Sequence, residues 1–189
     1  NFALLADTDL KIAYPEFHIE TTKINNQAVI GNFNDTIKAR QTIKVEGEVT
    51  DLNHQLISNF NGLVQVKAFG KPSIYSTLAN DPKSIKANFE VIDQIIYEGE
   101  ARAINGLFDF SFVVPTSISS SYGTGKISYY AIEEEGADTY YDANGGYIDF
   151  IIGGVDESIE NDLAGPEINI FMDNYQFKSG DPTTNTPLM

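Results

Sequence analysis

The densest group of side chains that could do chemistry is an acidic stretch in the second half of the chain. It comprises Glu133, Glu134, Glu135, Asp138 and Asp142. Calcium takes six to eight oxygen ligands of this kind, often from loops. The spacing does not match an EF-hand loop, however, and runs of charge in loops are usually solvated. The sequence therefore favours a solvated acidic loop, and a calcium site is the open alternative.

The two histidines, His18 and His54, are the candidate general bases. His54 lies in a predicted tight turn and is expected at the surface, while His18 follows Pro15 near the start of the chain. The chain has no cysteine, which excludes a thiol nucleophile, a disulfide and a thiolate zinc site. We therefore expect a chain that is not an enzyme, with no catalytic residue, no cofactor, no cofactor-binding residue and no metal ligand.

Tyrosines could form a platform on which sugar rings stack. The candidates are Tyr122, Tyr129, Tyr130, Tyr140, Tyr141 and Tyr147. Aromatic residues at alternating positions of paired strands are more often core residues and cross-strand partners. Core packing is therefore the favoured interpretation, and a carbohydrate- or surface-binding module is the alternative function. The pairs Gly145-Gly146 and Gly153-Gly154 match no phosphate-binding loop, and we predict that they form turns.

The charge of the chain limits its partners. Among 189 residues, 12 are Lys or Arg and 27 are Asp or Glu, which gives a formal net charge of −15. This balance argues against binding to nucleic acid or to anionic lipid headgroups. The apolar runs are far shorter than the ~20 residues of a membrane helix, so no direct membrane insertion is expected. The chain has no initiator Met and no signal-peptide pattern, and we expect a fragment of a longer protein.

Alternation of apolar and polar residues predicts β-strands along most of the chain. Predicted strands cover residues 41–50, 63–69, 107–114, 126–132 and 147–152. Asn105-Gly106 connects residues 101–104 to residues 107–114 and predicts a two-residue type I′ hairpin. Residues 51–54 and 144–146 are predicted turns. Residues 81–86 either begin a short helix at Pro82 or form an irregular crossover.

Roughly seven or eight such strands predict an all-β fold, and their spacing is typical of an immunoglobulin-like antiparallel β-sandwich. A barrel is the alternative. We expect the sandwich to cover residues 19–155 and the flanking segments to come from neighbouring domains. Residues 1–18 would end one neighbour, and residues 156–189 would be an acidic linker followed by the first strand of a further β domain.

Several short stretches resemble the gingipain-type (C25) family of cysteine peptidases. Residues 2–15 read FALLADTDLKIAYP and are similar to the closing segment of C25 catalytic domains, with Ala6 and Thr8 where the family has Gly and Pro. Further similar stretches are residues 35–39, 43–51, 60–64, 105–115, 122–131 and 165–168. Taken together, the chain resembles the region that follows the catalytic domain in PorU-like sortases of the type IX secretion system of Bacteroidetes.

The resemblance implies a non-catalytic module, because the catalytic His and Cys of the family lie upstream and no residue here matches them. It also implies that residues 1–18 end a C25 peptidase-like domain. The parent would be an extracellular cysteine peptidase at the cell surface, associated with the outer membrane, and this module would brace and space its catalytic domain. The implied partners are the neighbouring domains and, through the parent, type IX secretion components or cargo.

Overall fold

The structure is a computed structural model that describes residues 14–29, 33, 35–118, 120–133 and 141–159. Its described residues form strands, turns and loops, and no helix occurs among them, so the predicted all-β class is confirmed. The strands are β1 (Phe17–Ile24), β2 (Gln27–Ala28), β3 (Thr36–Ala39), β4 (Thr42–Thr50), β5 (Gly62–Phe69), β6 (Ser73–Ser76), β7 (Asn88–Val91), β8 (Ile95–Ala103), β9 (Leu107–Val113), β10 (Gly123–Thr124), β11 (Lys126–Glu133), β12 (Asp142–Tyr147) and β13 (Ile151–Val155).

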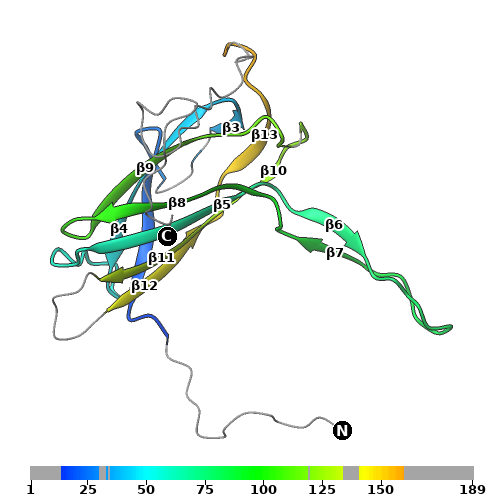
Figure 1. The fold of residues 1–189 in the computed structure, drawn as a ribbon, viewed down its shortest axis with the longest axis horizontal. Helices are drawn as coiled ribbons and strands as arrows, with labels where there is room; N and C mark the ends of the chain where they lie inside the picture. The colour runs from blue at the N-terminus through cyan, green and yellow to red at the C-terminus, as the bar shows by residue number, and fades with distance from the viewer. Residues whose placement is uncertain (1–13, 30–32, 34, 119, 134–140, 160–189) are drawn as a thin grey trace, which may run out of the picture. The chain divides into compact units, whose positions relative to one another are not determined.

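The largest sheet is nearly closed, like a barrel (Figure 1). It has eight strands in the order β8-β5-β11-β12-β1-β4-β9, with β2 added to β1. The first and last strands of this order, β8 and β9, are consecutive in sequence and are connected by Asn105-Gly106. Ile104 and Leu107 exchange two backbone hydrogen bonds across that turn. The two edges of the sheet therefore meet at one end.

The predicted hairpin at Asn105-Gly106 is confirmed. Asn105 has φ of 53° and Gly106 has φ of 77°, and positive φ at both central residues defines the type I′ turn. A Cβ on Gly106 would also lie 2.5 Å from the backbone oxygen of Ile57. Glycine is therefore required here for both its conformation and its size.

Two strand pairs are parallel, which corrects the purely antiparallel prediction. β1 pairs in parallel with β12 from Phe17 opposite Ala143 to Ile19 opposite Gly145, and β13 pairs in parallel with β3. Parallel neighbours need a long connection rather than a hairpin, and local patterns of sequence do not reveal such pairs. The immunoglobulin-like type stays a prediction, while the near closure of the sheet agrees with the barrel alternative.

The core follows from the alternation that predicted the strands. Side chains at every second position of β4, β5, β9 and β11 point inward and are buried. The three phenylalanines of β9 are buried as predicted and contact one another or the ring of Tyr129 on β11. Buried residues of these strands include Ile43, Val45, Val49, Val64, Val66, Ala68, Phe108, Phe110, Phe112, Ile127, Tyr129 and Ala131.

Gly145 and Gly146 lie within β12, so the prediction of a turn there is wrong. A Cβ on Gly145 would lie 2.0 Å from the backbone oxygen of Ile19 on β1. The glycine is therefore needed for the close approach of the parallel strand. Its neighbour Gly146 is less constrained, because a Cβ there would meet one atom, the backbone oxygen of Ile127, at 3.0 Å.

Gly153 and Gly154 also lie within a strand, β13, rather than in a turn. Both have positive φ, 147° and 74°, and the register of β13 against β3 shifts at this point. The two glycines thus form an irregularity inside the strand. The predicted strand over residues 147–152 is divided, since β12 ends at Tyr147 and β13 begins at Ile151.

Residues 71–93 form an extension of β5 and β8 that we call the β-arm. Gly70 N–H donates to the oxygen of Gln94 at 2.9 Å, and β6 then pairs antiparallel with β7. Residues 81–86 lie between these two strands, where Ser84 N–H donates to the oxygen of Asp81. They form the turn of a long hairpin, so both the short helix and the irregular crossover are wrong.

The two ends of the predicted domain are described in part. Phe17 and His18 belong to β1 and pair with β12, and Asp156 N–H donates to the oxygen of Ala39 at 3.1 Å. Residues 1–13 and 160–189 lie outside the described residues. Most of the predicted end of a peptidase-like domain, residues 1–18, falls there, and so does most of the segment 156–189 with the expected first strand of a further β domain.

Candidate functional site

A candidate site is an open groove of about 560 Å³ on the outer face of β1, β4, β8 and β9. Its lining combines three cationic side chains, three carboxylates and a few apolar groups. The lining residues are Thr22, Lys23, Lys44, Glu46, Gly47, Glu48, Arg102, Ile104, Leu107, Phe108 and Asp109. Sequence reasoning missed this groove because its residues come from four strands that are spread over more than half of the described chain.

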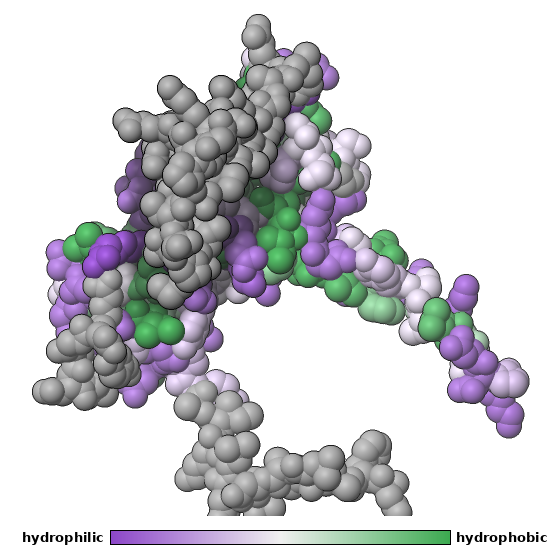
Figure 2. All heavy atoms as spheres, in the orientation of Figure 1, coloured by the Kyte–Doolittle hydropathy of each residue, from purple (hydrophilic) through white to green (hydrophobic). Residues whose placement is uncertain are grey.

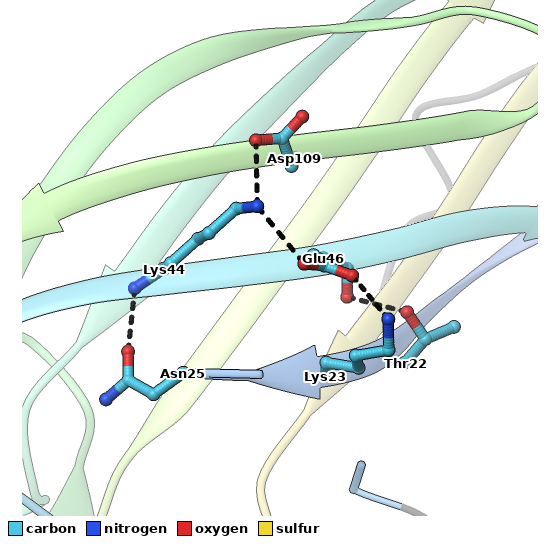
Figure 3. A network of polar contacts seen from close by, with 6 residues as sticks. All are labelled: Thr22, Lys23, Asn25, Lys44, Glu46 and Asp109. Carbon is cyan, nitrogen blue, oxygen red and sulfur yellow. Dashed lines mark hydrogen bonds and ion pairs between the residues drawn. The ribbon is translucent and has the colours of Figure 1, made fainter. Parts of the chain in front are cut away.

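A network of ion pairs lies in the groove and is centred on Glu46 (Figure 3). Lys23 Nζ lies 2.9 Å from Glu46 Oε2, and Lys44 Nζ lies 3.1 Å from Glu46 Oε1. Lys44 Nζ also lies 3.7 Å from Asp109 Oδ2. The backbone explains this arrangement, because Glu46 of β4 is opposite Lys23 of β1 and Asp109 of β9 in the registers of the two pairs.

Backbone contacts hold the same region in place. Thr22 Oγ1 donates to the backbone oxygen of Glu46 at 3.1 Å, and Lys44 N–H donates to Asn25 Oδ1 at 2.9 Å. The hydrogen bonds from Lys23 and Lys44 hold the pKa of Glu46 below its usual range. The hydrogen bond to Glu46 is likewise the main reason why the pKa of Lys44 is raised.

The chemistry of this groove is that of a surface ion-pair network. Its ionised groups are partly exposed to water, and exposed ion pairs contribute about 0–1 kcal/mol each. The network connects β1, β4 and β9 across their outer face and gives the groove mixed charge. The histidine bases considered from the sequence would have to lie next to a hydroxyl to activate it, and neither histidine is among the lining residues.

His54 is exposed, as predicted, and lies in the predicted turn. It has φ of 60°, and its backbone N–H donates to the oxygen of Asp51 at 3.1 Å. Its Nδ1 is hydrogen-bonded to the carboxylate of Glu20 on β1, and Thr50 Oγ1 donates to the same carboxylate at 3.1 Å. The hydrogen bond to Glu20 raises the pKa of His54, and Asp51 adds to this effect. His18 lies on β1 opposite Thr50.

The acidic stretch is described at its two ends, because residues 134–140 lie outside the described residues. Asp142 accepts a hydrogen bond from the hydroxyl of Tyr130 at 3.2 Å, and Glu133 N–H donates to the oxygen of Tyr141. Within the described ranges, no group of three or more His, Asp or Glu side chains is gathered as metal ligands would be. The calcium alternative depends on residues 134–140 and stays a prediction.

The tyrosines are divided between the core and the surface. Core packing is confirmed for Tyr129, which is buried and shares a hydrogen bond of 2.7 Å with the hydroxyl of Thr21. Burial raises the pKa of Tyr129. Tyr122 and Tyr130 are exposed, Tyr141 contacts the ring of Phe17, Tyr147 stacks on Phe150, and Tyr140 lies outside the described residues.

An exposed aromatic pair that the sequence did not indicate lies on the β-arm. Tyr75 of β6 and Phe89 of β7 are opposite each other, and their ring centroids are 6.1 Å apart. Each ring is about half exposed. The alternation within two four-residue strands is too short to predict such a pair, and its register depends on a hairpin that sequence reasoning had not assigned.

No family model matches the sequence, and no curated protein matches it. The described residues also include no helix that is long and apolar enough to cross a membrane. Among solved structures, the chain is similar to dimeric latent PorU from Porphyromonas gingivalis. The TM-score is 0.69 at 25% sequence identity, and the match covers 92% of this chain and 16% of the PorU chain. The chain therefore folds as a PorU-like domain, of a size that corresponds to a small part of PorU.

Proposed function

We propose that this chain is a non-catalytic β-domain of a larger PorU-like protein, in which it braces and spaces a neighbouring peptidase domain. The observation that carries the proposal is the match to PorU over nearly the whole of this chain but only 16% of the PorU chain. A cysteine peptidase needs a thiol nucleophile, and this chain has no cysteine. The peptidase activity therefore belongs to another part of the parent.

The location and organisation of the parent follow the family resemblance. We place it outside the cell, at the outer-membrane surface, in contact with type IX secretion components or cargo. The preceding C25 peptidase-like domain ends within the predicted segment 1–18, before β1 begins at Phe17. The immunoglobulin-like β-domain continues to residue 155, and residues 156–189 lead into a further β domain. The junction with the preceding domain lies next to the start of β1 at Phe17.

The way in which β1 is held supports a bracing role. It is the first described strand, and it is paired on both edges, with β12 and with β4. At its start, the ring of Phe17 lies 5.2 Å from that of Tyr141 and 6.4 Å from that of Phe60. A strand with two partners and an aromatic anchor at its first residue can hold a preceding domain in a fixed orientation.

The bracing role is tested in the full-length protein with Phe17→Asp, which places a charge among these aromatic rings. We expect a lower unfolding midpoint of the peptidase domain, faster proteolysis at the junction and loss of activity at elevated temperature. Ile148→Asp, at an exposed loop position, is the matched control and should behave like wild type. Peptidase stability and activity equal to wild type in Phe17→Asp, with the β-domain unfolded, would refute bracing.

The parent itself is tested by blotting cell fractions with an antibody raised against this chain. A band several times larger than 20.8 kDa in the outer-membrane fraction is the expected result. A band near 20.8 kDa in the cytoplasmic fraction would show that the chain is not a module of a larger surface protein.

A further inference from the structure

An exposed apolar patch lies on the outer face of β5 and β11. Its members Leu63, Tyr130 and Ile132 are 38%, 39% and 44% exposed, and we call them the Tyr130 patch. Leu63 is directly opposite Ile132 in the register of the two strands. Tyr130 precedes Ile132 by two residues, so all three side chains share one face. In Figure 2, hydrophobic and hydrophilic residues are intermixed on the visible surface where β5 begins and β11 ends.

Polar side chains flank the ring of Tyr130 on both sides. Tyr130 is opposite Gln65 of β5 and opposite Asn144 of β12, and both of these residues are exposed. Directly opposite residues of an antiparallel pair have Cβ atoms about 4.5–5.5 Å apart. Each amide group can both donate and accept hydrogen bonds. The ring therefore lies between two groups that are suited to binding hydroxyls.

The ring of Tyr130 is anchored through its hydroxyl. Tyr130 Oη donates to Asp142 Oδ2 at 3.2 Å, which restrains the orientation of the ring. Gly146 lies two residues after Asn144 on the same face of β12, where it is exposed and has no side chain. The surface of β12 beside the ring is therefore low, and a flat ligand can reach the ring from this side.

A groove of about 350 Å³ adjoins the Tyr130 patch. It is lined by Leu63, Gln65, Ile132 and Glu133, so it combines two apolar members of the patch with the amide of Gln65. Sites for small ligands have volumes of about 300–1,000 Å³ and mostly apolar walls with a few polar groups. The size and the composition of the groove fall in this class.

The area of the Tyr130 patch favours a small ligand over a protein partner. The exposed fractions of its three side chains correspond to roughly 240 Å², at about 200 Å² per large side chain. A standard protein interface needs ~800 Å² on each partner.

Charge around the patch disfavours an anionic ligand. Three carboxylates, those of Glu100, Glu133 and Asp142, are close to the patch in the strand registers, against the single cation Arg102. The whole chain also carries a net charge of −15. Because like charges oppose binding, a neutral ligand with hydroxyl groups fits this face better than an acidic one.

We propose that the Tyr130 patch binds a neutral saccharide, with one sugar ring stacked on Tyr130 and its hydroxyls hydrogen-bonded to Gln65 and Asn144. The C–H groups on one face of a sugar ring are apolar and pack on the electron-rich face of an aromatic ring. The hydroxyls at its edge donate and accept hydrogen bonds, as the two amides do. A second sugar unit extends over Leu63 and Ile132. The inference does not depend on the proposed bracing function.

Titration of the 189-residue chain with neutral oligosaccharides tests this proposal. The probes are maltohexaose, xylohexaose and mannohexaose, and binding is followed by the backbone amide NMR signals of Leu63, Gln65, Ile132 and Asn144. We expect at least one probe to shift these signals with a Kd between about 0.1 and 10 mM. Hexagalacturonic acid, the anionic counterpart, should bind at least ~5-fold more weakly.

Substitutions separate stacking from hydrogen bonding. Tyr130→Ala should raise the Kd at least ~10-fold, whereas Tyr130→Phe keeps the ring and should stay within ~2-fold of wild type. Gln65→Ala with Asn144→Ala should raise the Kd at least ~5-fold, because the hydroxyls of the sugar lose their partners. Tyr122→Ala, at a tyrosine 62% exposed outside the patch, is the matched control and should leave the Kd unchanged. Circular dichroism of each variant checks that the fold is retained.

Four results would overturn the proposal. The first is the absence of any shift with the three neutral probes at about 10 mM. The second is an unchanged Kd in Tyr130→Ala, or an equal loss in Tyr122→Ala. The third is tighter binding of hexagalacturonic acid than of the neutral probes. The fourth is a shift of the same signals when the chain alone is concentrated from about 10 to 500 µM, which would show that a second copy covers the patch.

Discussion

The buried hydrogen bond between Thr21 and Tyr129 gives a sharp test of how the core is organised. Thr21 of β1 is one of the few buried polar residues in the described core, and its hydroxyl lies 2.7 Å from that of Tyr129 on β11. Tyr129→Phe removes one hydroxyl and keeps the ring, so the edge-to-face contacts with Phe108 and Phe110 are retained. The Thr21 hydroxyl then loses this partner inside the core, which costs about 1–3 kcal/mol.

A double-mutant cycle measures this interaction. The free energy of unfolding is measured by urea titration with circular dichroism for Tyr129→Phe, Thr21→Val and the double variant. We expect each single change to lower the free energy of unfolding by about 1–3 kcal/mol, because each leaves the other hydroxyl without this bond. The double variant should cost about as much as one single variant, which corresponds to a coupling of ~1 kcal/mol. Each kcal/mol corresponds to about 2–4 °C in the midpoint for a chain of this size.

An additive double variant would refute the reasoning, because two hydroxyls that do not interact give independent costs. Tyr130→Phe is the matched control. Its hydroxyl donates to Asp142 in an exposed position, so this change should remain within about 0.5 kcal/mol of wild type. If Tyr130→Phe lowered the free energy of unfolding as much as Tyr129→Phe, burial of the hydroxyl would not determine the size of the effect.

Three further predictions concern glycines and pH. Gly106→Ala should lower the free energy of unfolding, measured by urea titration, by about 1–3 kcal/mol. Alanine disfavours a φ of 77°, and its Cβ would clash with the backbone oxygen of Ile57. Gly145→Ala should lower the free energy of unfolding by at least ~3 kcal/mol, because the new Cβ would lie 2.0 Å from the backbone oxygen of Ile19. Gly146→Ala should lower it clearly less, because its Cβ would lie 3.0 Å from the backbone oxygen of Ile127. The hydrogen bond to Glu20 raises the pKa of His54 above its unfolded value near 6.5. The His54–Glu20 pair therefore stabilises the folded state fully below about pH 6.5, and this stabilisation is lost as the pH rises through the raised pKa. The difference in unfolding midpoint between wild type and His54→Gln should therefore be largest below about pH 6.5 and shrink as the pH rises above that value.

The elements that sequence could predict are those specified by neighbouring residues. Alternation identified β4, β5, β9 and β11, and Asn105-Gly106 identified its hairpin, since a type I′ turn is a property of two adjacent residues. Gly145 shows the limit of this reasoning. Its role depends on the backbone of Ile19, which is distant in sequence, and a glycine pair alone is as consistent with a turn as with a close strand contact.

The candidate site was hidden from sequence for a related reason. Lys23, Glu46 and Asp109 meet because β4 lies between β1 and β9 in a particular register. The register of β1 against β4 also shifts between Thr21 and Lys23, and a one-residue slip would move these side chains to the other face. The turn at His54 was predictable from local residues, whereas its partner Glu20 was not.

The position of β1 between β4 and β12 constrains the order in which the domain can fold. The pairs β5–β8 and β4–β9 and the β8–β9 turn involve segments that are all present once residue 113 has emerged from the ribosome. The parallel partner of Phe17 is Ala143, so one edge of β1 stays open until nearly the whole domain has been synthesised. Such long-range pairing slows folding and leaves an unpaired strand exposed meanwhile. During that interval β1 is the segment most in need of protection by a chaperone or by an adjoining domain.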